Sequence, residues 1–145
     1  HVVRAQQLYQ RRAGLVDRPA EAAANREMAS ALRVKAPSLD APVAGLSGGN
    51  QQKAVFGRAL MPGPRVVLLD EPTRGVDVGA KAEMYALVCG LAAKGMAVVL
   101  ASSELPELMG LCDRILMLRE GAVAGRFERG ATQERLLAAA LGQRP

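Results

Sequence analysis

The sequence contains few of the residues on which many enzymes and nucleic-acid-binding domains depend. Its 145 residues include no Trp, two Phe and two Tyr, and His1 is the single histidine. This shortage of aromatic residues argues against a stacking platform for single-stranded nucleic acid, which needs exposed rings. One histidine at the edge of the chain also excludes most histidine-based acid–base or metal chemistry.

Cysteines and long apolar runs are scarce as well. Cys89 and Cys112 are too few and too far apart for a disulfide framework or a zinc site, so a reduced, cytoplasmic protein is expected. Cys89 lies in a helical apolar pattern and is expected to be a small core residue. No stretch approaches the run of about 20 apolar residues that spans a bilayer. Any membrane connection is therefore expected to go through a partner.

The charge balance is positive but dispersed. The 19 basic and 14 acidic side chains give a net charge of +5, and the arginines are scattered, with Arg11 and Arg12 the densest pair. This distribution favours a solvated surface facing anionic partners over a nucleic-acid patch.

Half of the residues are apolar, and their spacing predicts alternating helices and strands. Helices are expected at 1–12, from Asp17 to about Val34, from Gly49 to the Pro62–Pro64 stop, from Asp77 to Gly95, at 106–110 and from Thr132 to Leu141. Strands are expected at 66–69, 96–101, 114–119 and 122–127, the last two joined by a Glu120-Gly121 turn. This order predicts an α/β layer fold, with the strands at 66–69 and 96–101 buried on both faces of a parallel sheet. In the predicted helix after Gly49, the buried face is expected to contain Val55, Phe56, Ala59 and Leu60.

One stretch, Leu-Ser-Gly-Gly-Asn-Gln-Gln-Lys at residues 46–53, combines two glycines with the expected start of a helix. Adjacent glycines leave backbone N–H groups bare, the helix dipole adds partial positive charge, and Ser47 supplies a hydroxyl donor. A lone Ser-Gly-Gly would more often be an ordinary turn before a helix. The full eight-residue stretch, followed by an acidic-ended strand, instead favours a phosphate site.

The second stretch is the apolar run Val66–Leu69, which ends in Asp70, Glu71 and Pro72. A carboxylate at Asp70 is the hard oxygen ligand that Mg²⁺ needs. Glu71 places a second carboxylate directly after it. The alternative is a charged strand end with solvated carboxylates, which the flanking Thr-Arg-Gly-Val-Asp sequence disfavours.

In this order, separated by one helix, the two stretches resemble the signature motif and the Walker B strand of an ABC-transporter ATPase. The Asn-Gln-Gln-Lys variant is most similar to the ATP-binding subunits of ribose, xylose and galactose importers. The resemblance implies an ABC-type P-loop NTPase (RecA-like) fold that works with ATP and Mg²⁺. It implies nucleotide contacts from Ser47, Gly48, Gly49, Gln51 and the D-loop aspartate Asp77, with Asp70 as the metal ligand and Glu71 as the catalytic glutamate.

The sequence departs from the family pattern in two respects. Ser103 occupies the place of the histidine that contacts the γ-phosphate, and a serine cannot replace it fully, because its hydroxyl is shorter and does not titrate near neutrality. Ser103 as a simple helix cap is the alternative. No Gly-x-x-x-x-Gly-Lys-Ser/Thr occurs. We therefore expect part of the second ATPase domain: a partial helical signalling subdomain at 1–45 and the C-terminal half of the core at 46–145, without the Walker A motif and Q-loop.

The function that this resemblance implies is ATP hydrolysis that energises sugar import through a membrane permease, at the cytoplasmic face of the inner membrane. The expected partners are the other ATPase half and the permease. Without a phosphate cradle this chain alone is expected to be inactive, and an open sheet edge is expected to promote self-association. The alternatives are a soluble ABC ATPase acting on ribosomes or DNA, and a binding module that merely retains the motifs.

Overall fold

The computed structural model describes residues 16–143, so the segment predicted as a helix at 1–12 lies outside the described residues. These residues form two compact units, one of residues 16–67 and 72–98 and the other of residues 68–71 and 99–143. Within the described range, no helix combines the length and apolar character required to cross a membrane. The boundary expected near residue 45 remains a prediction.

The first unit begins with helix α1 (Arg18–Ala31), which starts where the sequence predicts. The Asp17 side chain accepts a hydrogen bond from the Ala20 backbone N–H at 3.2 Å and caps the helix. The helix ends three residues before the predicted Val34, because Arg33 adopts a left-handed conformation with φ of 51°. The Val34 N–H then donates back to the Ala29 carbonyl at 2.8 Å, which closes the helix end.

Helix α2 (Gly48–Leu60) follows the short 3₁₀ turn η2 (Val43–Gly45). Phe56 and Leu60 are buried as predicted, but Val55 is 65% exposed and Ala59 is also exposed, so the predicted face is wrong by part of a turn. The reason is that α2 packs against both α1 and α3, and its buried stripe includes a lysine and a glycine that the apolar count missed. The buried residues are Lys53, Ala54, Phe56, Gly57 and Leu60.

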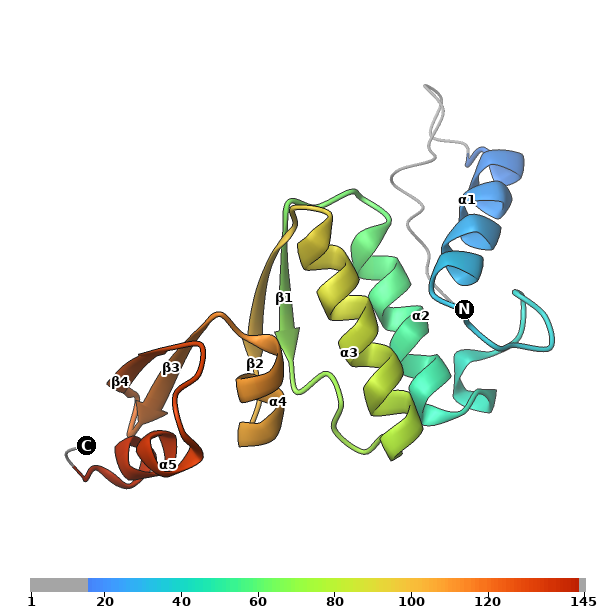
Figure 1. The fold of residues 1–145 in the computed structure, drawn as a ribbon. Helices are drawn as coiled ribbons and strands as arrows, with labels where there is room; N and C mark the ends of the chain where they lie inside the picture. Colours follow the sequence, from blue (N-terminus) through green and yellow to red (C-terminus); the bar gives the residue numbers. More distant parts are fainter. Residues whose placement is uncertain (1–15, 144–145) are drawn as a thin grey trace. The chain divides into compact units, whose positions relative to one another are not determined.

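Helix α3 (Val78–Ala93) runs alongside α2 (Figure 1). The Asp77 side chain caps it by accepting from the Ala80 N–H at 2.9 Å, and Met84 and Val88 are buried. Cys89, expected in the core, is exposed. Successive helical residues are about 100° apart around the axis, so the residue after the buried Val88 turns away from the packed face.

Strands β1 (Val66–Asp70) and β2 (Ala97–Ala101) form a two-stranded sheet. The Ala97 N–H donates to the Arg65 carbonyl at one end and the Glu71 N–H to the Ala101 carbonyl at the other, so the strands run parallel. The prediction that both faces are buried is wrong. Leu69 is buried, whereas Leu68 on β1 is 76% exposed and Val99 on β2 is 56% exposed, because alternate side chains point to opposite faces and only one face is covered.

The second unit contains α4 (Leu105–Leu111), β3 (Arg114–Arg119), β4 (Ala122–Glu128) and α5 (Gln133–Leu141). The antiparallel hairpin β3–β4 confirms the predicted turn: Glu120 and Gly121 both have positive φ, 51° and 78°. Helix α5 packs beside this hairpin (Figure 1). The core of the unit consists of Leu108, Ile115, Phe127, Leu136 and Ala139.

Candidate functional site

The glycine pair of the 46–53 stretch lies at the surface, at the first turn of α2. Ser47 and Gly48 are exposed and Gly49 is partly exposed. Ser47 is the N-cap residue, but its side chain caps none of the first-turn N–H groups. The caps of α3 and α5, Asp77 and Thr132, do accept from such groups. The start of α2 therefore keeps the bare, partly positive character that favours an anion.

The Ser47 hydroxyl is instead engaged by Asn50, which sequence reasoning did not single out. Asn50 Nδ2 donates to Ser47 Oγ at 2.8 Å, and Asn50 Oδ1 accepts from the Lys35 backbone N–H at 2.8 Å. The only signal in the sequence was the position of Asn50 within the 46–53 stretch. Gln51, predicted to contact the nucleotide, donates through Nε2 to the Leu46 carbonyl at 2.8 Å. That bond stabilises the turn before α2. It uses the side-chain nitrogen of Gln51, so the side-chain oxygen is the atom that could accept a hydrogen bond from a ligand.

Asp77, the predicted D-loop aspartate, belongs to the same unit as the glycine pair. Its Oδ1 caps α3, and its side chain is exposed. The loop before it is tied to α2, because Gln52 Nε2 donates to the Arg74 carbonyl at 3.3 Å. Helix capping and a role toward a ligand are compatible, since a carboxylate has several lone pairs.

Lys53 is a buried cation within this unit, with a side chain only 5% exposed. Its Nζ donates to the Arg33 carbonyl at 3.3 Å and forms an ion pair with Glu83 of α3. Hydrogen bonding to Lys53, and then its positive charge, hold the pKa of Glu83 below its ordinary value. Lys53 thereby joins α2, α3 and the end of α1.

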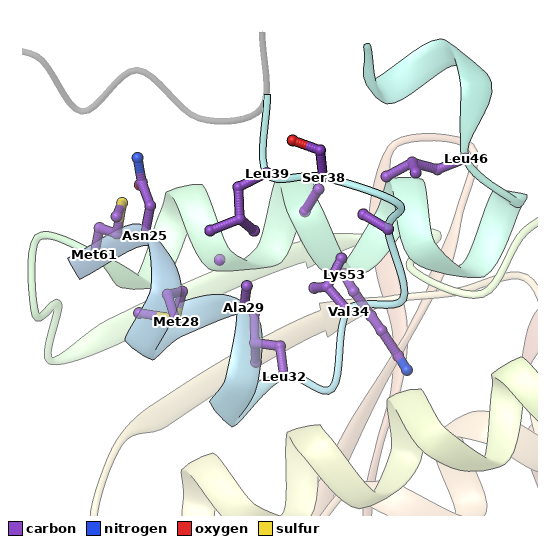
Figure 2. Close-up of a pocket in the computed structure, with 13 residues that line it drawn as sticks. Asn25, Met28, Ala29, Leu32, Val34, Ser38, Leu39, Leu46, Lys53 and Met61 are labelled. Atoms are coloured by element: carbon purple, nitrogen blue, oxygen red, sulfur yellow. The ribbon is translucent and has the colours of Figure 1, made fainter. Parts of the chain in front are cut away.

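The stem of Lys53 lines a small cavity between α1 and α2, of about 40 Å³ (Figure 2). Met28, Leu32 and Met61 also line it. The Lys53 side chain points away from Met28 and Met61, so its nitrogen lies far from these two residues (Figure 2). Sites for cofactors and drug-sized ligands hold roughly 300 Å³ or more. This cavity is therefore a packing gap, too small for the nucleotide that the sequence predicts.

The remaining predicted residues, Asp70, Glu71 and Ser103, all lie in the second unit. Asp70 is the last residue of β1 and exposed, at the carboxyl end of a parallel strand pair. Glu71 has φ of 46°, a conformation that costs a non-glycine residue about 1–2 kcal/mol. Its Oε1 accepts from the Ser103 N–H at 2.9 Å, which anchors one carboxylate oxygen and leaves the other for a further partner.

Ser103 does not cap α4, so that alternative is wrong. The N-cap residue is Glu104, and the Glu104 N–H donates to the Ser102 hydroxyl at 3.0 Å. Ser103 contacts Glu71 through its backbone N–H, which any residue except proline could supply at this position.

The donor set at Asp70 fits a shared magnesium site better than a protein cage. Between residues 16 and 143 there is no cluster of three or more potential metal-binding side chains among His, Cys, Asp and Glu. Mg²⁺ commonly takes one or two carboxylates and completes its shell with water and phosphate oxygens. A single exposed carboxylate at a strand end satisfies that chemistry.

Comparison with known proteins decides the family. The model of the ABC transporter family matches residues 3–74. The xylose import ATP-binding protein XylG of Moorella thermoacetica is 57% identical over 77% of this chain, and the ribose import ATP-binding protein RbsA of Corynebacterium glutamicum is 52% identical over 91%. The chain belongs to the ABC transporter ATP-binding family. It spans about a quarter of the length of these relatives, 22% and 25% respectively.

Solved structures confirm the fold of this ABC ATPase chain. An inward-facing ABC transporter of metal-chelate type has a TM-score of 0.80 at 20% identity, over 94% of this chain and 54% of that one. A dimeric ATP-binding cassette bound to ADP and phosphate has a TM-score of 0.72 at 22% identity, over 86% of this chain and 53% of that one. The expected P-loop NTPase fold is therefore confirmed.

Proposed function

We propose that this chain is the C-terminal part of the second ATPase domain of a monosaccharide importer, in which the start of α2 closes over ATP held by the opposite ATPase half. The observation that carries the proposal is the 52% identity to a ribose import ATP-binding protein over 91% of the chain. The protein would lie peripherally at the cytoplasmic face of the membrane, against a sugar permease.

The nucleotide contacts follow from the first turn of α2. The N–H groups of Gly48 and Gly49 and the hydroxyl of Ser47 would donate to a terminal phosphate, whose charge the helix dipole also favours. The absence of a side-chain cap leaves these backbone groups available. Gln51 and Asp77 would contribute at the edge of the same interface.

Asp70 and Glu71 would serve the nucleotide site of this half. Bound Mg²⁺ supplies a charge that neutralises phosphate oxygens. Asp70 would hold that ion, and Glu71 would orient the attacking water through the carboxylate oxygen that Ser103 does not engage. Because Ser103 offers a hydroxyl in place of an imidazole, this half should stabilise the transferring phosphoryl group less well.

The test uses the full-length subunit with its permease in sealed vesicles. ATP-driven uptake of a labelled pentose or hexose is expected. Ser47→Ala should lower ATP hydrolysis about tenfold or more, because a donor to developing phosphate charge is lost. Glu71→Gln should lower it at most about twofold if this half is weakened, because a weak site contributes little to the total rate. Normal hydrolysis by the Ser47 variant, or co-purification with ribosomes in place of a permease, would refute the proposal.

We also propose that the 145-residue chain alone binds Mg-ATP weakly and self-associates. It contains no P-loop sequence, and the exposed Leu68 and Val99 offer apolar strand surface. Calorimetric titration should show no micromolar binding, and light scattering should show a mass that grows with concentration. A strictly monomeric chain, or tight ATP binding, would contradict these expectations.

A further inference from the structure

Asn50 has a hydrogen-bonding arrangement that neither the motif nor the proposed function explains. Its side chain bridges two groups far apart in the sequence, the hydroxyl of Ser47 and the backbone N–H of Lys35, both at 2.8 Å. Lys35 follows α1, and Ser47 begins α2. One amide therefore connects the segment after α1 to the residue proposed to contact phosphate.

The direction of both hydrogen bonds follows from the chemistry of the partners. A backbone N–H can only donate, so the Asn50 atom facing Lys35 must be the carbonyl oxygen. The other atom is then the NH₂ group, and Ser47 Oγ must accept from it. The hydroxyl proton of Ser47 is not consumed by this contact, and Ser47 caps no backbone group of α2. Asn50 thus leaves Ser47 able to donate to a ligand.

A second contact one turn along α2 holds the same segment. Lys53 Nζ donates to the carbonyl of Arg33, a residue in the left-handed conformation. Asn50 and Lys53 are three residues apart, so they share a face of α2. Residues 33–35 are therefore attached to α2 at two points, and Asn50 is the one that also contacts Ser47.

We propose that Asn50 is a positioning residue for the phosphate-binding hydroxyl of Ser47. It holds Ser47 Oγ as an acceptor so that its proton faces the phosphate, and it couples the placement of the 33–35 segment to that hydroxyl. This inference rests on the proposed function of Ser47.

The test is a double-mutant cycle on ATP hydrolysis by the full-length subunit with its permease. Asn50→Ala should lower kcat/KM for ATP about tenfold when Ser47 is present. In a Ser47→Ala background the same change should have less than a twofold effect, because its target is gone. Equal effects of Asn50→Ala in both backgrounds would overturn the inference and indicate a merely structural tether. No effect of Ser47→Ala alone would overturn the proposed function, and the inference with it.

A second variant keeps the test decisive if Asn50→Ala does not fold. Asn50→Asp retains an oxygen for the Lys35 N–H, but its other oxygen can only accept, so the Ser47 hydroxyl must turn and donate to it. Hydrolysis should fall about tenfold or more relative to wild type, while hydrogen exchange of the Lys35 amide stays slow. Wild-type hydrolysis by the folded Asp variant would overturn the inference.

Discussion

The two glycines at the start of α2 should respond to alanine in opposite directions. A Cβ added to Gly49 would lie 2.8 Å from the Cβ of Ala80 in α3, whereas one added to Gly48 would meet nothing closer than the Gly75 carbonyl oxygen at 3.9 Å. Carbon atoms pack at about 3.5–4.0 Å, so the first contact is too close by roughly 1 Å. Both atoms are attached directly to backbone, so no rotation relieves the overlap and the helices must separate.

The magnitudes follow from two opposing effects. Separating packed elements costs about 1–3 kcal/mol, and replacing glycine by alanine in a helix returns up to about 1 kcal/mol. Gly49→Ala should therefore destabilise the first unit by about 1 kcal/mol. Gly48→Ala lacks the overlap and should stabilise it by about 0.4–1 kcal/mol. The predicted separation of the two variants is about 1.4–2 kcal/mol, the sum of these two changes.

The assay is native-state hydrogen exchange of peptides from α2 and α3, which reports the opening free energy of this unit. Peptides from the β3–β4 hairpin, in the other unit, serve as an internal control and should not change. In an Ala80→Gly background the overlap is removed, so Gly49→Ala should become stabilising. A shift of both glycine variants in the same direction, or no reversal in the Ala80→Gly background, would refute the packing argument.

Three further predictions concern other features of the fold. Arg33→Gly should stabilise the chain by about 1 kcal/mol, because φ of 51° strains a residue with a side chain; a lower urea midpoint would contradict this. Cys89 is exposed, whereas burial and then the nearby charges of Asp113 and Glu107 raise the pKa of Cys112. Cys89 should therefore be alkylated at least about tenfold faster than Cys112 at pH 8, measured by mass spectrometry of the peptides. The pKa of Glu83 lies below its ordinary 4.5 because of Lys53, so its contribution to stability is present above that pH and is lost as the pH falls through the lowered value. Urea midpoints measured from pH 7 to pH 3 should therefore fall less steeply in Glu83→Gln than in the wild-type chain. The same pH dependence in both proteins would contradict the stabilising role of the Glu83 carboxylate.

The helix starts and the hairpin were predictable because they depend on residues close together in the chain. Asp17, Asp77 and Thr132 each cap a helix through a backbone N–H three residues ahead. Glu120-Gly121 forms the predicted turn, in which both residues have positive φ, a conformation that glycine adopts without strain. The helix start that follows Ser47 and the strand end at Asp70 were predicted on the same local grounds.

Burial was less predictable, because it depends on what packs against each face. Val55 and Cys89 follow helical apolar patterns yet are exposed, and Leu68 is exposed in a strand predicted to be covered on both faces. Lys53, which is not among the expected core residues, is buried because Arg33 and Glu83 supply the partners that its ammonium requires.

The sequence alone determined where this protein carries its glycine-pair turn and its carboxylate-ended strand, because glycine pairs, caps and apolar runs act over a few residues. Only the tertiary structure decided how those groups are held. The amide of Asn50 bridges 15 residues back to Lys35, and the Ser103 N–H donates to Glu71 across 32 residues. Such bonds depend on chain segments brought together by folding, so no local pattern specifies them.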